Sequence, residues 1–246
     1  MNKTAVIILA AGHGKRMQSE LPKALVSLNG KPLISHVIDA VRASGLTNDP
    51  IIVVGQKREK VMEMLGDSYR YAVQEEQLGT GHAVLSAKEF LTTDTTGVVV
   101  LYVDHPFVSP ETIRALAETR EKNSAKIAMA TVSLPDFHEW RTAFLGFGRV
   151  KRDVDGKIIG IVEAKDATEE EKNILEVNPA YFSFDQKWLL EALPKLKNAN
   201  AQGEYYLVDL VKMAFEEGLE IPTISITPRE AIGTNSKEDV GIAEGI

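Results

Sequence analysis

Runs of apolar residues alternate with stretches of helical periodicity through the first half of the chain. The apolar runs are rich in β-branched side chains, which is typical of strands buried on both faces of a sheet, and they cover residues 5–9, 50–55, 71–73 and 97–103. The stretches between them place apolar side chains on one helical face, and they cover residues 32–41, 59–65 and 81–90. This alternation predicts an α/β fold with a mixed, mostly parallel central sheet and helices on both faces.

Beyond about residue 125 the predicted strands follow one another with short connections. We expect these strands at residues 127–134, 148–152, 158–163, 180–184 and 223–226. Asp155-Gly156 predicts a hairpin turn, and such a hairpin is typical of a small β-rich lid. Further helices are expected after the capping pair Ser109-Pro110, over residues 168–174, around Trp188 and over 207–215. We find no internal repeat or linker, so a single domain over residues 1–246 is expected.

The charge balance and composition exclude several classes of partner and chemistry. The 246 residues include 28 Lys and Arg against 35 Asp and Glu, a formal net charge of -7, so we expect neither nucleic acid nor a membrane as a partner. The chain has no cysteine, which excludes disulfides, thiolate zinc sites and cysteine nucleophiles. No apolar stretch approaches the roughly 20 residues of a membrane-spanning helix, and a cytoplasmic location is expected.

The first apolar run leads into a loop that contains Gly12 and Gly14. A loop of this kind exposes backbone N–H groups to a ligand. Three cations stand close to it in the sequence, namely Lys15, Arg16 and Lys23. The spacing fits neither a dinucleotide fingerprint, which needs a third glycine where Met17 stands, nor a Walker loop. The loop therefore predicts a polyanion site, and an ordinary strand-to-helix turn is the alternative.

Two further segments are candidates for binding. Asp104 directly follows the run 97–103 and would lie at the carboxyl edge of the sheet, where ligands bind in open α/β folds. A carboxylate there suits Mg²⁺, and a turn cap is the alternative. Residues 74–83 combine side-chain amides with Gly79-Thr80-Gly81, which suits the edge of a nucleobase, and a capped helix is the alternative.

The histidines and serines give no comparable signal. None of the histidines forms a metal-ligand spacing, so we interpret all of them as structural: His13, His36, His82, His105 and His138. The serines Ser19, Ser133 and Ser183 lack a nucleophile elbow or a paired base, so covalent catalysis is not expected.

Six segments, in order along the chain, together resemble one family. They are residues 9–23, 74–83, 101–104, 146–149, 162–168 and 200–206. The chain is similar to the uridylyltransferase (pyrophosphorylase) domain of the bifunctional UDP-N-acetylglucosamine pyrophosphorylase/glucosamine-1-phosphate acetyltransferase family. The resemblance implies a Rossmann-like nucleotidyltransferase fold of the GT-A-like kind. It divides the domain into a nucleotide-binding part, about 1–125, and a sugar-binding and lid part, about 126–230.

The resemblance also implies an activity that serves cell-envelope biosynthesis. UTP and a sugar 1-phosphate would give a UDP-sugar and pyrophosphate, with Mg²⁺ as cofactor. A sugar phosphate is largely dianionic near neutrality because its second pKa is about 6, so its oxygen can attack the α-phosphorus without a protein nucleophile. The barrier is mostly charge, which the metal and the cations would offset.

The matching positions imply a set of site residues. The nucleotide would contact Leu9, Ala11, Gly12, Gly14, Gln74, Gly79 and Thr80, and the catalytic cations at the triphosphate would be Arg16 and Lys23. Mg²⁺ would be held by Asp104 and Asn235. The sugar would contact Tyr102, Gly148, Glu163 and Asn178.

Several positions depart from the family pattern near the expected sugar pocket. Val103 replaces the usual glycine, Pro179-Ala180 replaces Thr-Gly, and Phe147 replaces a tyrosine. We therefore expect a reshaped pocket, with N-acetylglucosamine 1-phosphate as the default acceptor. Another sugar 1-phosphate or nucleotide, or a non-catalytic nucleotide-binding module, remain alternatives.

One further expectation concerns what the chain does not contain. We find no hexapeptide repeats after Asn235, so the acetyltransferase part is expected to be absent and the protein to be a monomer.

Overall fold

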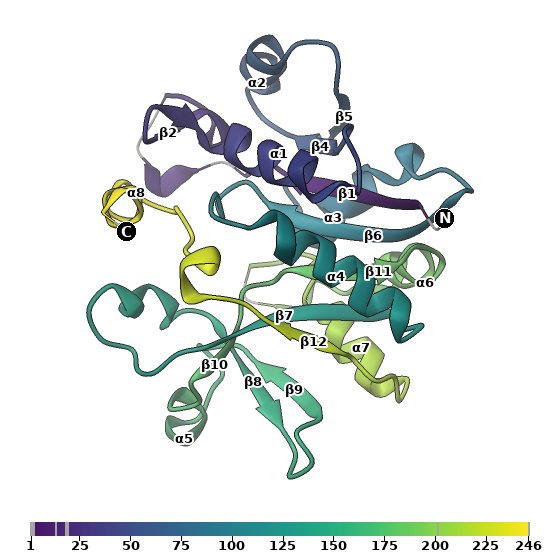
Figure 1. The fold of residues 1–246 in the computed structure, drawn as a ribbon, viewed down its shortest axis with the longest axis vertical. Coiled ribbons are helices and arrows are strands. Elements are labelled where there is room, and N and C mark those ends of the chain that lie inside the picture. The colour runs from purple at the N-terminus through teal and green to yellow at the C-terminus, as the bar shows by residue number, and fades with distance from the viewer. Residues whose placement is uncertain (1–2, 13, 18–19, 201, 246) are drawn as a thin grey trace.

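The computed structural model describes residues 3–12, 14–17, 20–200 and 202–245, and a ten-stranded sheet runs through it (Figure 1). The strands of this sheet are β1 (Lys3–Leu9), β4 (Ile51–Val54), β5 (Arg70–Val73), β6 (Thr95–Tyr102), β7 (Ile127–Ser133), β8 (Gly148–Arg152), β9 (Ile158–Val162), β10 (Glu176–Asn178), β11 (Phe182–Asp185) and β12 (Thr223–Ser225). A separate two-stranded sheet pairs β2 (Ser27–Leu28) with β3 (Lys31–Pro32). The helices are α1 (Leu33–Ser44), α2 (Arg58–Leu65), α3 (Thr80–Ser86), α4 (Pro110–Lys122), α5 (Glu169–Lys172), α6 (Gln186–Ala192), α7 (Asp209–Glu216) and α8 (Lys237–Glu244).

The main sheet is mixed, as predicted, but it is not mostly parallel, because five of the nine strand pairings described in it are antiparallel. Its order is β5-β4-β1-β6-β11-β7-β10-β8-β9, with β12 beside β7. Strands β5, β4, β1 and β6 pair in parallel, and β11 then pairs antiparallel with both β6 and β7. The parallel half therefore brings the ends of β1 and β6 to one edge, where the glycine loop and Asp104 begin.

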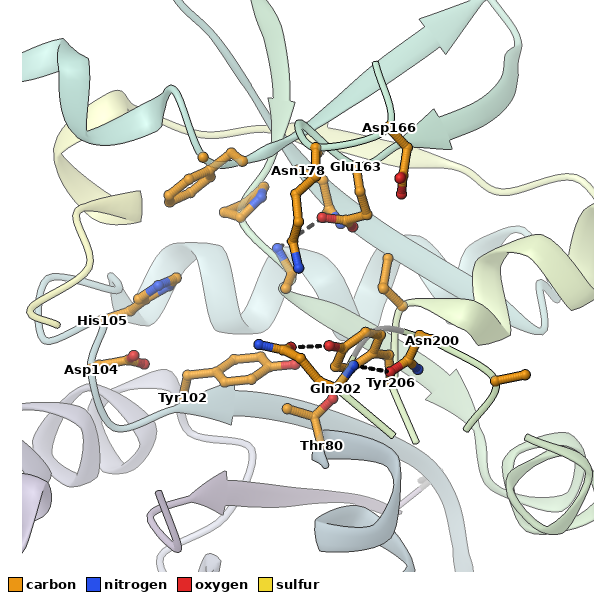
Figure 2. Close-up of a pocket in the computed structure, with 18 residues that line it drawn as sticks. Thr80, Tyr102, Asp104, His105, Glu163, Asp166, Asn178, Asn200, Gln202 and Tyr206 are labelled. Carbon is orange, nitrogen blue, oxygen red and sulfur yellow. Dashed lines mark hydrogen bonds between the residues drawn. The ribbon is translucent and has the colours of Figure 1, made fainter. Parts of the chain in front are cut away.

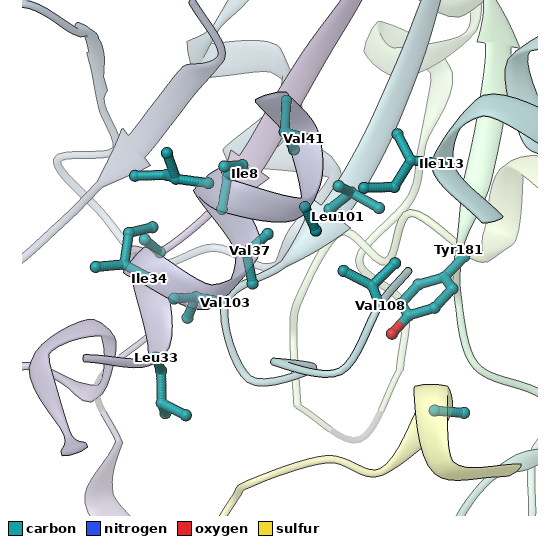
Figure 3. Close-up of a cluster of buried hydrophobic side chains, with 14 of the residues drawn as sticks. Ile8, Leu33, Ile34, Val37, Val41, Leu101, Val103, Val108, Ile113 and Tyr181 are labelled. Atoms are coloured by element: carbon teal, nitrogen blue, oxygen red, sulfur yellow. The ribbon is translucent and has the colours of Figure 1, made fainter. Parts of the chain in front are cut away.

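Helices cover both faces of the sheet because the side chains of each strand alternate between them. In β1, Val6 and Ile8 belong to a core with α1 and α4, whereas Ala5, Ile7 and Leu9 belong to a core with α3, α6 and α7. Figure 3 shows the first of these cores, in which α1 packs over Ile8. Full burial of such a side chain contributes about 1.5–3 kcal/mol, so both helical layers hold β1 in place.

The predicted lid hairpin continues the main sheet. Strands β8 and β9 pair antiparallel, and β8 joins the sheet through β10, which pairs with β7. The Asp155-Gly156 turn has Gly156 at φ 80°, a left-handed conformation that glycine tolerates. Helix α4 begins as predicted, because the Ser109 hydroxyl accepts a hydrogen bond from the Thr112 amide. Among the described residues, no helix has the length and apolar character that a membrane crossing requires.

Some boundaries differ from the prediction. The helix expected over 81–90 divides into α3 and a 3₁₀ turn at Lys88–Phe90; the Ser86 hydroxyl donates to the His82 carbonyl, a contact that competes with regular helix. The strand expected from residue 180 begins at Phe182, because Ala180 has a φ of 63° that a strand does not permit. The short strands β2, β3 and β10 and the helix α8 escaped prediction, since two or three residues carry little periodicity and α8 is only weakly amphipathic.

Candidate active site

The glycine loop turns back toward the sheet beside Lys23. Gly14 has a φ of 57°, and a Cβ added there would lie 3.1 Å from the Lys23 Cβ, so a larger residue would press on that lysine. An added Cβ at Gly12 would meet nothing within 4 Å. The loop is therefore tightly packed at one glycine and open at the other. His13 and Ser19 lie outside the described residues, and so does the side chain of Lys15.

A cluster of charged and polar side chains lies next to this loop. The Lys23 Nζ donates to the Asp104 Oδ2 at 2.6 Å and to the Asn235 Oδ1 at 2.9 Å. The Arg16 guanidinium donates to the same Asn235 oxygen at 3.2 Å. The four residues that the resemblance assigns to catalysis and metal binding are thus brought together, although more than 200 positions separate the lysine from the asparagine.

The backbone around Asp104 and Asn235 holds the cluster in place. The amide and hydroxyl of Thr234 donate to the Asp104 carbonyl at 2.7 and 3.0 Å. The Asp239 carboxylate accepts from the Asn235 amide at 2.9 Å and forms the capping box that begins α8. The start of α8 therefore fixes the asparagine beside the end of β6.

The charge state of the cluster follows from its burial and partners. Burial would raise the pKa of the Asp104 carboxyl, but the Lys23 ammonium and the protonated form of His105 lower it, and the net shift is downward. The carboxylate is therefore ionised at neutral pH. Burial, and next the Asp104 charge, raise the pKa of the Tyr102 phenol, so this group stays protonated.

A cavity of about 280 Å³ opens over the glycine loop. Its lining includes six of the seven residues that the resemblance assigns to the nucleotide, all except Gly14: Leu9, Ala11, Gly12, Gln74, Gly79 and Thr80. The Gln74 carboxamide donates to the Gly79 carbonyl at 3.0 Å and contacts His82 Nδ1 at 3.1 Å, so its orientation is set by protein partners. We interpreted His82 as structural, and in the structure its ring helps to orient the Gln74 carboxamide.

Gly79 lies against the backbone of Tyr205, a residue distant in the sequence, and only a glycine leaves room for this contact. It has a φ of 107°, and an added Cβ would lie 2.6 Å from the Tyr205 carbonyl oxygen. The Tyr205 amide donates to the Leu78 carbonyl at 2.7 Å, and the Gly81 amide donates to the Tyr205 carbonyl at 2.8 Å. The segment 202–206 therefore packs directly on the start of α3, where a side chain at residue 79 would push it away.

A second cavity of about 650 Å³ adjoins the first (Figure 2). All four residues that the resemblance assigns to the sugar line it, namely Tyr102, Gly148, Glu163 and Asn178. Thr80, Tyr102 and Asp104 line both cavities. The two cavities therefore meet beside the charged cluster.

Local contacts restrict what the larger cavity offers to a ligand. The Asn178 Oδ1 accepts from the Ala180 amide at 2.8 Å, which fixes the orientation of the carboxamide in the cavity wall. A Cβ added at Gly148 would lie 2.8 Å from the Ile161 Cγ2. Burial raises the pKa of the Glu163 carboxyl above its ordinary value.

The resemblance assigned no ligand contact to several other residues of this wall, which are His105, Phe147, Asn200, Gln202 and Tyr206. Of these, His105 was interpreted as structural and Phe147 was expected to reshape the pocket. The His105 ring is buried and stacks on Phe147, with ring centroids 6.4 Å apart and planes 6° apart. The Tyr206 hydroxyl donates to the Gln202 carboxamide oxygen. The sequence signal for Asn200, Gln202 and Tyr206 was that the segment 200–206 is part of the resemblance to the family.

The cluster suits a hard divalent cation. Among the described residues, no group of three or more His, Cys, Asp and Glu side chains is arranged to hold a metal. However, the oxygens of Asp104 and Asn235 both lie within 3 Å of one Lys23 atom, so they converge. Mg²⁺ commonly takes one or two protein oxygens and completes its shell with phosphate oxygens and water.

The fold and the site together define an α/β protein in which two adjoining cavities meet beside a cluster of charged side chains. The chain belongs to the family described as the MobA-like NTP transferase domain, which matches residues 6–207. It is 43% identical over 232 residues to the bifunctional protein GlmU of Clostridium acetobutylicum, covering 94% of this chain and 49% of that protein. It is 36% identical over 244 residues to the bifunctional protein GlmU of Caldicellulosiruptor saccharolyticus, covering 98% of this chain and 51% of that protein.

These comparisons confirm the predicted resemblance and the fold. The chain spans about half the length of the curated relatives it matches. A solved structure of UDP-glucose pyrophosphorylase complexed with UDP-glucose superimposes with a TM-score of 0.79 at 17% identity, covering 100% of this chain and 98% of that chain. At this identity the likeness shows the fold alone.

Proposed function

We propose that this protein is a sugar-1-phosphate uridylyltransferase that joins UTP to N-acetylglucosamine 1-phosphate and releases pyrophosphate. One observation carries the proposal: the smaller cavity over the glycine loop and the larger cavity meet at Asp104, beside Lys23 and Arg16. Two anionic substrates that react with each other need two adjoining sites with cations between them. The GlmU relatives and the NTP transferase family support the same reaction class.

The smaller cavity is assigned to UTP. Its glycine loop gives a polyphosphate close access to backbone, and Lys23 lies in its wall. The oriented Gln74 carboxamide and the backbone around Gly79 supply fixed donors and acceptors for the edge of uracil.

The larger cavity is assigned to the sugar 1-phosphate, with Glu163 and Asn178 as polar contacts for its hydroxyl and acyl groups. A phosphate oxygen of the acceptor would attack the α-phosphorus of UTP, a new phosphorus–oxygen bond would form, and the bond to the pyrophosphate oxygen would break. Because the acceptor is already an anion, no protein base is needed.

Charge is the main obstacle, and Lys23 and Arg16 would stabilise the charge that develops on the departing pyrophosphate. Asp104 and Asn235 would hold Mg²⁺. When bound, this cation would neutralise phosphate oxygens and polarise the α-phosphorus.

A second candidate function has a specific observation in its favour. Pro179 and Ala180 line the larger cavity, and the proline removes a backbone donor there. This change would favour a different sugar 1-phosphate with the same nucleotide chemistry.

Pyrophosphate release with a panel of nucleoside triphosphates and sugar 1-phosphates, with Mg²⁺, tests the proposal. We expect UTP with N-acetylglucosamine 1-phosphate to give the highest kcat/KM. A higher value with another sugar would correct the acceptor. Tight UTP binding with no pyrophosphate from any acceptor would replace the proposal with a nucleotide-binding module. The expected monomeric state and cytoplasmic location stay predictions.

A further inference from the structure

The oxygens that would hold a divalent cation already have a cation of the protein between them. The Lys23 ammonium lies 2.6 Å from the Asp104 carboxylate and 2.9 Å from the Asn235 amide oxygen. The Lys23 side chain is 9% exposed and that of Asp104 is 20% exposed, so water screens this pair weakly. An ammonium and a divalent cation cannot both occupy the point on which the two oxygens converge.

The burial of Asp104 explains why the ammonium stays beside it. Asp104 is a largely buried carboxylate, and a buried charge without a partner is strongly unfavourable. The stem of Lys23 packs at Gly14, while the ammonium is carried by flexible methylene groups. The ammonium can therefore change partners without any movement of the loop, provided that another anion compensates it.

We propose that Lys23 closes the divalent-cation site of the free protein and that a nucleoside triphosphate opens it. The triphosphate offers Lys23 and Arg16 a new anionic partner, and the Asp104 and Asn235 oxygens then become available to the metal. Divalent cation and nucleotide therefore bind with positive coupling, and each increases the affinity for the other by the same factor. This inference rests on the proposed nucleotide site, and it adds an order of binding.

Binding of Mn²⁺, a paramagnetic substitute for Mg²⁺, tests this inference without turnover. Free Mn²⁺ is measured by electron paramagnetic resonance in a titration of the whole chain, with and without UTP and with no acceptor present. A protein-free titration with the same UTP concentration corrects for Mn²⁺ that the nucleotide alone holds. We expect the wild-type protein to bind Mn²⁺ at least about tenfold more tightly with UTP than without it. Equal affinity in the two conditions overturns the proposal.

Variants assign the effect to Lys23. Lys23→Met should bind Mn²⁺ without nucleotide at least about tenfold more tightly than wild type, and the added replacement Asp104→Asn should abolish that gain. Lys3→Met removes a lysine that pairs with Asp94 at 3.0 Å at the opposite end of β1, and it should behave as wild type. If Lys23→Met does not fold, as judged by circular dichroism, Lys23→Gln takes its place, and equal Mn²⁺ affinity of the wild-type protein with and without UTP still overturns the proposal.

The failure of this inference is distinguishable from the failure of the proposed function. Pyrophosphate release together with uncoupled Mn²⁺ binding leaves the enzyme assignment intact and removes the role of Lys23 in closing the site. Coupled binding of Mn²⁺ and UTP without pyrophosphate release from any acceptor supports the role of Lys23 and removes the enzyme assignment.

Discussion

At the scale of single residues, Arg16 is expected to contribute to the reaction rate and little to the stability of the fold. Its residue is exposed, and its guanidinium contacts Asn235 at 3.2 Å in the charged cluster. An exposed arginine contributes little to stability through such a contact, whereas a cation beside the reacting phosphates would contribute much to the rate.

We expect Arg16→Ala to lower kcat by about 100- to 1000-fold, which corresponds to roughly 3–4 kcal/mol of lost transition-state stabilisation. Its urea unfolding curve should match that of wild type. Steady-state pyrophosphate release measures the rate, and Arg42→Ala on the exposed surface of α1 is the matched control. A wild-type rate for Arg16→Ala would refute the assigned role.

Ala180 has a left-handed backbone conformation, which alanine does not favour. Its φ of 63° lies in the left-handed region, which costs an L-residue about 1–2 kcal/mol relative to glycine. Glycine would avoid this cost, but it gives the unfolded chain more conformational entropy than alanine does, which offsets about 0.4–1 kcal/mol of the gain. Ala180→Gly should therefore stabilise the protein by about 0.5–1 kcal/mol in urea unfolding, while Ala43→Gly in the exposed part of α1 should destabilise it by about 1 kcal/mol. A loss of stability in Ala180→Gly would show that this estimate of strain is wrong.

Glu163 should make stability depend on pH. Burial raises its folded-state pKa above the ordinary value of 4.5, so the folded protein binds more protons than the unfolded chain just above pH 4.5. The Glu163 contribution therefore becomes unfavourable as the pH rises from 4.5 through the raised pKa. Glu163→Gln should remove this part of the pH dependence and increase the free energy of unfolding at pH 8 relative to wild type. Urea unfolding at pH 4 and pH 8 checks this, with exposed Glu118→Gln as the control; identical pH dependence in wild type and Glu163→Gln would contradict it.

At the scale of elements, Arg149 connects strand β8 to the wall of the larger cavity. The residue is 1% exposed, and its guanidinium donates to the carbonyls of Leu145 at 3.2 Å, of Lys172 at 3.3 Å and of Phe147. It also lies 4.6 Å from the centre of the Phe137 ring. Among these contacts the guanidinium is paired with backbone carbonyls and not with a carboxylate. The arginine thereby holds residues 145–147, and this segment places Phe147 in the wall of the larger cavity.

Arg149→Met should leave these carbonyls without a donor and destabilise the protein by about 2–4 kcal/mol. Because the segment lines only the larger of the two cavities, the KM for the sugar phosphate should increase several-fold while the KM for UTP changes little. Arg152→Met is the control, since Arg152 is on the same strand but pairs with Glu176 at 2.6 Å outside both cavities. An equal increase of both KM values would indicate a general loss of structure.

The elements also show where sequence patterns are informative. Strands β1, β4 and β6 and helix α1 were predicted because long apolar runs and helical spacing are local properties. Strand β10 has three residues and depends on pairing with β7 and β8, so its own sequence carries too little periodicity. Helix α8 has a clear capping box at Ser236 and few apolar side chains, and its packing beside β2 was needed to identify it.

At the scale of the whole molecule, one sheet crosses the boundary between the proposed nucleotide-binding part, about 1–125, and the sugar-binding part, about 126–230. Strand β11 pairs with β6 of the first part and with β7 of the second, and α4 packs beside strands from both parts. We therefore propose that the two parts fold as a single domain.

This continuity predicts one unfolding transition. The chain has two tryptophans, and Trp188 lies on α6 while Trp140 lies in the 3₁₀ segment Glu139–Phe144. Both tryptophans lie in the sugar-binding part, about 126–230, so their fluorescence follows the unfolding of that part. Circular dichroism follows the helices and strands of both parts, and the urea midpoints from the two signals should coincide. Two separate midpoints would show two domains.

The sequence by itself determined the elements whose physics is local: the buried strands, the amphipathic helices, the Ser109 cap and the glycine loop with its cations. Tertiary structure alone decided that Lys23 lies between Asp104 and Asn235 and that Tyr205 packs on Gly79. The reason is physical. Periodicity and turn chemistry depend on neighbouring residues, whereas these contacts join positions more than 80 residues apart, and their distances are set by the packing of the whole sheet and its helices.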